Sequence, residues 1–131
     1  MNKVNFTGQF IKFSFVGVIN TIITLLTIWI FVNIFSSSHY LANIAGYVFG
    51  VLNSYFFNKI WTFSNKSKVS VTLVKFVVVF GISYLIQLGM LYILINYTSI
   101  EPFICQILSM IFYTIINFTL NKKVTFKTDI K

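Results

Sequence analysis

Four long apolar runs, separated by short polar segments, constrain this chain more than any other feature. The runs cover about residues 10–35, 41–63, 73–97 and 103–121. A helix needs about 20 predominantly apolar residues to cross the hydrocarbon core of a bilayer. Each run reaches about that length, and the segments between them leave no room for a soluble catalytic domain. We therefore predict an all-α membrane protein with four transmembrane helices.

The composition agrees with a chain that is integral to a membrane. Of its 131 residues, 57% are hydrophobic and only 9% are charged, whereas soluble domains carry roughly 25% charged residues. A chain this apolar cannot cover a water-exposed surface with polar groups. The first apolar run is too long for a signal peptide and lacks a small-residue cleavage site, so we expect it to be a membrane span.

The positive charges predict the orientation of the spans. The ten lysines lie around the start of the first run, around the loop between the second and third runs, and after the fourth run, at positions 3, 12, 59, 66, 68, 75, 122, 123, 127 and 131. The polar turns at 36–40 and 98–102 carry none. By the positive-inside rule, the lysine-bearing side and both termini are cytoplasmic. Topology thus accounts for the net charge of +8, and nucleic acid is not needed as a partner.

The chain also matches itself at a shift of 63 residues. Identical residues then recur from Lys12, Phe13, Val16, Ile19, Ile23, Leu25, Ile30, Asn33, Ser36, Ile44, Phe49, Asn58, Lys59, Thr62 and Phe63. Self-similarity at a fixed period is typical of structural repeats. We predict one transmembrane domain, residues 1–131, built from two parallel two-helix repeats at about 10–63 and 73–126. Their common axis would run along the membrane normal.

Acidic residues are missing from the spans. Glu101 lies in a polar turn and Asp129 in the tail. A proton-coupled multidrug exporter would usually have an acidic residue within the membrane, so this class is disfavoured. The sequence also shows no nucleophile–base pair, and the single Cys105 offers neither a disulfide framework nor a metal-binding spacing. We expect a non-enzyme without a cofactor or metal.

The second and fourth runs end alike, in NSYFFNKIWTF at 53–63 and INFTLNKKVTF at 116–126. Each ending carries two polar residues four apart, next to a lysine: Ser54 and Asn58 before Lys59, and Asn117 and Asn121 before Lys122. Residues four apart share one helix face. These stripes could form interhelical hydrogen bonds, worth about 0.6 kcal/mol each, beside lysines that reach toward the membrane surface. Alternatively, amide, hydroxyl and ammonium groups could hold a phosphate. A further pattern, Gly46 with Gly50, favours close approach of two helices.

These endings, together with Lys12–Phe13 and VGVINT at 16–21, resemble the GtrA-like family of small four-span membrane proteins over about residues 9–127. The resemblance implies translocation of a polyprenyl-phosphate-linked monosaccharide, for example on undecaprenyl phosphate, across the bacterial cytoplasmic membrane. The sugar would then modify a cell-surface polymer such as teichoic acid or O-antigen. The alternative is a non-transporting adaptor that anchors a polyprenyl-phosphate glycosyltransferase. Expected partners are the lipid-linked sugar, this glycosyltransferase and membrane lipids, and a homodimer is one assembly that we consider.

The resemblance and the polar stripes together indicate a set of lipid-phosphate- and sugar-binding residues. The set is Asn20, Ser54, Asn58, Lys59, Phe63, Lys75, Gln106, Asn117, Asn121, Lys122 and Phe126. Four positions depart from the family pattern. Lysine replaces the frequent arginine at 59 and 122, and lysine lacks the bidentate fork that suits phosphate. Gln106 stands where a basic residue is frequent, and Val124 replaces the tryptophan expected in the second motif.

Overall fold

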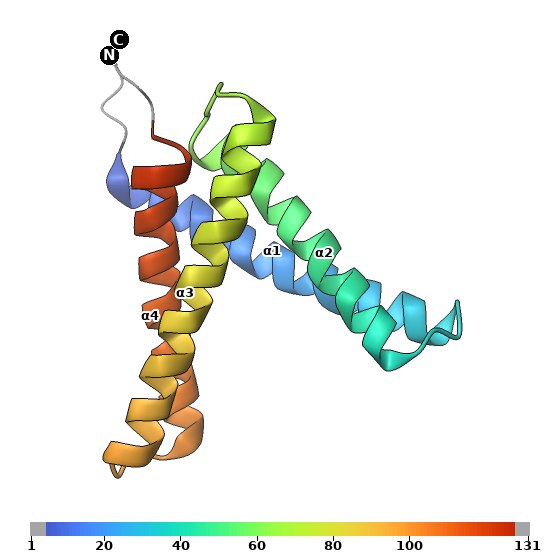
Figure 1. Cartoon of the computed structure of the whole chain (residues 1–131), viewed down its shortest axis with the longest axis vertical. Coiled ribbons are helices and arrows are strands. Elements are labelled where there is room, and N and C mark those ends of the chain that lie inside the picture. The colour runs from blue at the N-terminus through green and yellow to red at the C-terminus, as the bar shows by residue number, and fades with distance from the viewer. Residues whose placement is uncertain (1–4, 128–131) are drawn as a thin grey trace. The chain divides into compact units, whose positions relative to one another are not determined.

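A computed structural model describes residues 5–127, and every regular element in that range is helical. The elements are α1 (Phe6–Asn33), α2 (His39–Phe57), η1 (Asn58–Thr62), α3 (Val69–Tyr97), α4 (Pro102–Leu120) and η2 (Asn121–Thr125). The labels η1 and η2 denote single π-helical turns that continue α2 and α4. Figure 1 shows the four helices α1 to α4 along the chain. The predicted all-α class is confirmed.

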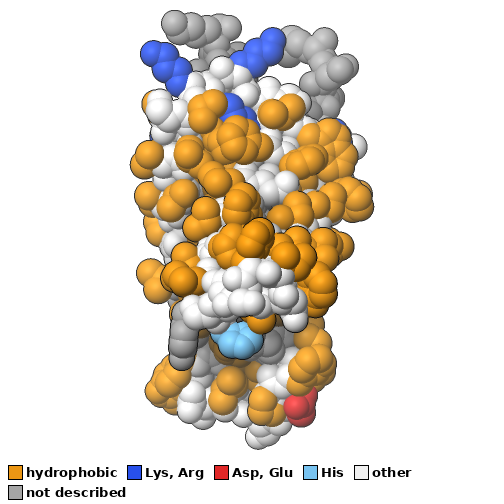
Figure 2. Space-filling view, turned by 90° about the vertical axis from the view of Figure 1, so that its right-hand side faces the viewer, with side chains coloured by type: hydrophobic (Ala, Val, Ile, Leu, Met, Phe, Trp, Pro, Cys, Tyr) orange, Lys and Arg blue, Asp and Glu red, His pale blue; other side chains and the backbone are white. Residues whose placement is uncertain are grey.

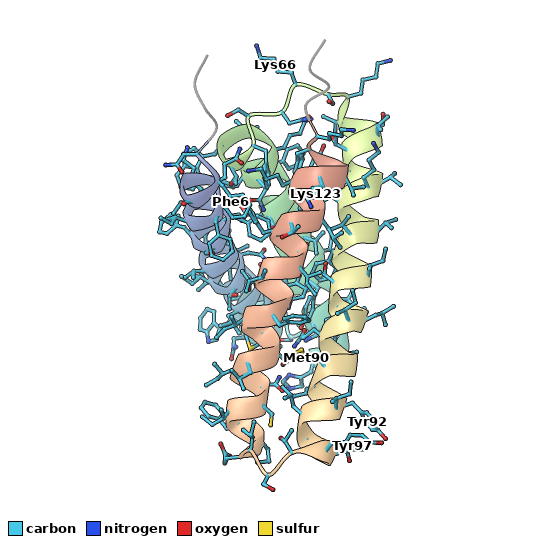
Figure 3. All side chains as sticks on the ribbon, turned by 90° about the vertical axis from the view of Figure 1, so that its left-hand side faces the viewer. Phe6, Lys66, Met90, Tyr92, Tyr97 and Lys123 are labelled. Atoms are coloured by element: carbon cyan, nitrogen blue, oxygen red, sulfur yellow. The ribbon has the colours of Figure 1, made fainter. Side chains whose placement is uncertain are left out.

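The chain divides into two compact units, Met1–Lys66 and Ser67–Lys131, which we call unit 1 and unit 2. Unit 1 is a hairpin of α1 and α2, and unit 2 is a hairpin of α3 and α4. Within unit 1, Phe6 and Lys66 lie at the same end of the hairpin, and within unit 2, Tyr97 and Lys123 lie at opposite ends (Figure 3). Each hairpin therefore carries lysines at its open end, away from its turn.

Close contact between α1 and α2 depends on two glycines. A Cβ atom on Gly46 would lie 2.9 Å from the carbonyl oxygen of Thr24 and 2.7 Å from Cγ1 of Ile28. On Gly50 it would contact the side-chain oxygens of Thr24 and Asn20. Only a residue without a side chain allows the two backbones to approach this closely. The helix contact predicted from the glycine spacing is confirmed.

The buried positions of the two units correspond at the same separation of 63 residues. Matched positions that are buried in both units are Phe13 and Phe76, Val16 and Val79, Ala42 and Cys105, Tyr55 and Phe118, Asn58 and Asn121, Thr62 and Thr125, and Phe63 and Phe126. Most other large apolar side chains are exposed, and Figure 2 shows hydrophobic side chains over much of the viewed surface. Such a surface suits lipid rather than water.

Three helical stretches among the described residues are long and apolar enough to cross a membrane: Phe6–Asn33, Val69–Tyr97 and Pro102–Thr125. The chain is thus a membrane protein by length and composition of its helices. The segment from α2 through η1 is not in this group. The predicted span at 41–63 therefore stays a prediction.

The helices extend beyond the predicted spans at several ends. α1 begins at Phe6 and α3 at Val69, whereas the apolar runs begin at about 10 and 73. A helix can continue into polar sequence, because its backbone bonds do not require apolar side chains. α4 begins at Pro102, and the Glu101 carboxylate accepts a hydrogen bond from the Ile104 N–H at 3.2 Å. This cap satisfies an N–H that the first helical turn leaves without a partner.

Candidate functional site

Both polar endings fold into π-helical turns. The Phe63 N–H donates to the Asn58 carbonyl at 2.9 Å, and the Phe126 N–H donates to the Asn121 carbonyl at 2.8 Å. Each bond joins residues five apart, so each turn holds one residue more than an α-helical turn. π-turns are rare and frequently occur at functional sites. The sequence pattern predicted helix ends here but gave no sign of this geometry.

In unit 1 the polar stripe is hydrogen-bonded along its length. The Asn58 amide donates to the Ser54 hydroxyl at 3.2 Å. The Thr62 hydroxyl donates to the Asn58 side-chain oxygen at 2.9 Å. Asn58 and Thr62 are buried, so these bonds satisfy polar groups that water does not reach. The contact between Ser54 and Asn58 that their spacing indicates is present.

The matching stripe in unit 2 is only partly satisfied. The Asn121 amide donates to the side-chain oxygen of Asn117 at 2.8 Å and to its carbonyl at 2.9 Å, and the Asn117 amide donates to the Tyr113 hydroxyl at 3.0 Å. The side-chain oxygens of Asn121 and Thr125 are buried without a hydrogen-bond partner. The bond that closes the stripe in unit 1 is therefore absent between the matched residues of unit 2.

The lysines of the two motifs occupy different surroundings. Lys59 is buried, and its ammonium donates to the Asn65 side-chain oxygen at 3.2 Å. The Asn65 N–H donates back to the Lys59 carbonyl at 2.8 Å, across a turn in which Ser64 has a φ of 47°. Lys122 is half-buried, and its Nζ lies 5.8 Å from the centroid of the Phe118 ring. Lys59 is thus fixed in the unit 1 turn, whereas Lys122 lies against a ring.

The phenylalanines that end the motifs pack inside their hairpins. The ring centroids of Phe13 and Phe63 are 6.2 Å apart, and those of the matched Phe76 and Phe126 are 6.1 Å apart. Phe63 and Phe126 are both buried. These pairs tie each π-turn to the first helix of its own unit. Their burial makes them supports of the turns rather than exposed anchors at the membrane surface.

The remaining predicted residues lie outside the two polar stripes. Lys75 and Gln106 are exposed. Gln106 precedes Asn121 by 15 residues on a continuous helix, which corresponds to about 22 Å along the axis. It therefore belongs to a different region of unit 2 from the π-turn. The Asn20 side-chain oxygen lies beside Gly50 and is buried without a partner, as is the hydroxyl of the matched Ser83.

Several functional candidates were missed by sequence reasoning. Thr62 and Thr125 follow Asn58 and Asn121 by four residues, so the helical spacing that indicated the stripes could have included them. Ser83 occupies the position matched to Asn20, and the repeat could have identified it. Asn65 had no such signal, because its contact with Lys59 depends on the turn at Ser64. Within residues 5–127, no group of three or more His, Cys, Asp or Glu side chains could hold a metal ion.

Comparison with known proteins places the whole of this arrangement within one family. A family model described as the GtrA/DPMS transmembrane domain matches residues 12–126, from the lysine near the start of α1 to the phenylalanine after η2. The chain is also similar to the uncharacterized membrane protein YwcD of Bacillus subtilis (strain 168). The two are 28% identical over 115 residues, which cover 85% of this chain and 91% of that protein.

Proposed function

Because the chain belongs to the GtrA/DPMS transmembrane-domain family, we propose that it moves a polyprenyl-phosphate-linked monosaccharide across the bacterial cytoplasmic membrane. The family match itself indicates a membrane protein with a role in handling sugars on carrier lipids. The proposal adds translocation as the activity and a carrier such as undecaprenyl phosphate. It also adds a cell-surface polymer, such as teichoic acid or O-antigen, as the final acceptor of the sugar.

The proposal includes four spans, with both termini in the cytoplasm and the two hairpins as parallel repeats. The α2–η1 segment, from His39 to Thr62, matches the α4–η2 segment in its length and in the position of its π-turn. The matched buried positions of the two units support the repeat. Lysines at the open ends of both hairpins support a common cytoplasmic side.

One observation carries the proposed activity: apolar helices enclose side-chain oxygens that have no protein partner. These oxygens belong to Gln9 and Asn20 in unit 1 and to Ser83, Asn121 and Thr125 in unit 2. An unsatisfied buried polar group costs about 1–3 kcal/mol, and polar groups inside a membrane usually mark a functional site. Sugar hydroxyls can donate hydrogen bonds to such oxygens. The isoprenoid tail can remain in the surrounding lipid while the polar head crosses.

The charge distribution supports entry from the cytoplasmic side. The lysines at the open ends of the hairpins would attract the anionic phosphate, since each basic residue near a membrane surface contributes about 1 kcal/mol. The predicted spans contain no acidic residue that would repel it. Transfer of the sugar to the polymer on the outer side would remove the lipid-linked sugar there, so its net movement across the membrane would be outward. In this mechanism the protein lowers the barrier to crossing and supplies no energy of its own.

Reconstitution in liposomes tests this function. The wild-type protein should accelerate transbilayer movement of a fluorescent polyprenyl-phosphate sugar, measured by loss of signal to a quencher that cannot cross the membrane. Thr125→Val and Ser83→Ala each remove an unpaired hydroxyl and should slow the movement. Thr119→Val is the matched control, because the Thr119 hydroxyl donates to the Ile115 carbonyl within the same helix at 2.7 Å.

Wild-type protein that fails to accelerate movement would refute the flippase proposal. If a partner glycosyltransferase nevertheless requires the protein for its activity, the adaptor function would replace it. Topology is tested separately in a Cys105→Ser background, with single cysteines placed at Ser37 and Ser67. Membrane-impermeant maleimide should label position 37 from outside intact cells and position 67 only after the membrane is opened.

A further inference from the structure

Unit 1 carries an apolar groove, separate from the polar stripe of Ser54, Asn58 and Thr62. The groove has a volume of about 420 Å³, within the roughly 300–1,000 Å³ that is usual for small-molecule sites. Four aromatic side chains and two isoleucines line it: Phe15, Ile19, Phe56, Phe57, Ile60 and Trp61. All six belong to α1, α2 or η1, so the groove is formed within one compact unit.

A lysine stands at one end of this groove. The Lys12 Nζ lies 5.2 Å from the centroid of the Trp61 ring. The Phe15 and Trp61 rings meet edge-on, with their centroids 6.0 Å apart. Lys12, Phe15 and Ile19 follow one another at helical spacings of three and four residues, so they occupy one face of α1. Along this face of α1, Lys12 is nearest the open end of the hairpin, and the apolar Phe15 and Ile19 follow it toward the turn.

The π-turn contributes to the shape of the groove. Successive residues of an α-helix are rotated by about 100° around the axis, so a turn with one extra residue changes the direction of the side chains at its end. Trp61 lies in η1 and remains 42% exposed, whereas its neighbour Thr62 is buried. The geometry of η1 therefore presents the indole ring to Lys12 and Phe15 while it keeps the polar stripe inside the hairpin.

We propose that this groove and Lys12 bind the carrier lipid itself, with the phosphate of a polyprenyl phosphate at Lys12 and its first isoprenoid units along Phe15 and Trp61. This inference rests on the proposed function and assigns the lipid part of the substrate to unit 1. The lining presents no acidic side chain, and the single cation is complementary to a phosphate. A polyprenyl phosphate has one hydrocarbon chain on one phosphate, which matches one groove beside one lysine. A phosphatidate has two acyl chains, and the groove matches only one of them.

At the matched positions, unit 2 has a lysine but no aromatic side chains. Lys75 corresponds to Lys12, while Val78 and Val124 correspond to Phe15 and Trp61. Aromatic side chains bury large apolar areas and attract a nearby cation. The two units are therefore specialised. Unit 1 holds the lipid chain beside its phosphate, and unit 2 presents the unpaired oxygens of Asn121 and Thr125.

Tryptophan fluorescence tests the groove directly. In a Trp29→Phe background, Trp61 is the only tryptophan of the chain. The full-length protein is placed in phosphatidylcholine nanodiscs and titrated with decaprenyl monophosphate, with uncharged decaprenol, or with dioleoyl phosphatidate. We expect Trp61 emission to shift with decaprenyl monophosphate at a mole fraction roughly tenfold lower than with either control lipid. A hydrogen-bonded charge contributes about 1.5–3 kcal/mol, and 1.4 kcal/mol corresponds to a factor of ten.

Variants in the same background separate the groove from the rest of the protein. Lys12→Gln should weaken the response to decaprenyl monophosphate roughly tenfold, and Phe15→Ala should weaken it as well. Val78→Ala in unit 2 should leave it unchanged. Phe15 is 55% exposed, so its replacement should leave the circular dichroism spectrum of the protein intact.

Two results would overturn the groove proposal. Equal responses to phosphatidate and decaprenyl monophosphate would identify an ordinary lipid contact. Unchanged affinity in both Lys12→Gln and Phe15→Ala would place the binding elsewhere. The translocation assay gives an independent result. Specific binding at Trp61 without transport would support the groove and refute the flippase, whereas transport that persists in Phe15→Ala and Lys12→Gln would refute the groove and keep the flippase.

Discussion

Replacement of Gly46 by alanine should loosen the hairpin of unit 1. The added Cβ would lie 2.9 Å from the Thr24 carbonyl oxygen and 2.7 Å from Cγ1 of Ile28. The carbonyl belongs to the backbone of α1 and cannot rotate away, so the helices must separate. Gly17, in α1, provides the control, because a Cβ at this position would meet no other part of the structure within 4 Å.

The magnitude follows from the comparison of the two variants. Overpacking of a close contact costs about 1–3 kcal/mol. Alanine in place of glycine in a helix interior contributes up to about 1 kcal/mol in the opposite direction. Because both sites are helical, this gain cancels between Gly46→Ala and Gly17→Ala. The difference in unfolding free energy between the two variants should therefore be about 1–3 kcal/mol, and it reports the packing cost alone.

The assay is unfolding in mixed micelles, with increasing mole fractions of sodium dodecyl sulfate and helix content followed by circular dichroism. Gly46→Ala should unfold at a lower mole fraction than wild type, and Gly17→Ala at an equal or higher one. Gly50→Ala should fall between them, because its added Cβ meets side-chain oxygens of Thr24 and Asn20 that can adjust. Equal midpoints for Gly46→Ala and Gly17→Ala would refute the close packing of α1 on α2.

Three further predictions concern individual contacts. Thr62→Val should lower the unfolding free energy by about 1–3 kcal/mol, because it leaves the buried Asn58 side-chain oxygen unpaired. Thr125→Val should leave the unfolding free energy unchanged. Equal losses for the two variants in the same micelle titration would contradict the asymmetry between the π-turns. Glu101→Ala should destabilise α4 by about 1 kcal/mol through loss of its cap, seen as faster amide exchange in its first turn, with Glu101→Asp as the control expected to retain the cap. Cys105 is fully buried, so a membrane-permeant maleimide should label it only after sodium dodecyl sulfate is added, and rapid labelling in mild detergent would exclude this packing.

The helices themselves could be predicted from the sequence because apolar run length and turn chemistry act locally. The turn before α4 is an example. Pro102 has no backbone N–H to leave unsatisfied at the helix start, and Glu101 supplies the capping oxygen. The glycine pair was also predictable, since Gly46 and Gly50 lie on one face of α2 and only small residues permit close approach. Three of the expected spans meet the requirements of length and hydropathy.

The details of the candidate site depend on contacts that a sequence pattern does not contain. The spacing places Asn58 beside Ser54 but cannot tell which groups their side chains pair with. The burial of Lys59 depends on the reversal of the chain at Ser64, which brings Asn65 back to it. The π-turns depend on how the phenylalanine at each end packs against the first helix of its unit. Family resemblance indicated which residues to consider, and the unpaired oxygens of unit 2 came only from the structure.

The π-turns also bear on the history of the gene. A helix that gains one residue by insertion can absorb it as a π-turn without disturbing the bonds on either side. Here the two turns begin at Asn58 and Asn121, which are 63 residues apart, the same separation as the internal match. We propose that the two repeats arose by duplication of one two-helix unit, in which case a single insertion in that unit accounts for both turns. The widened turn would then be older than the four-helix chain, and an ancestor that assembled from two identical hairpins would already have possessed it.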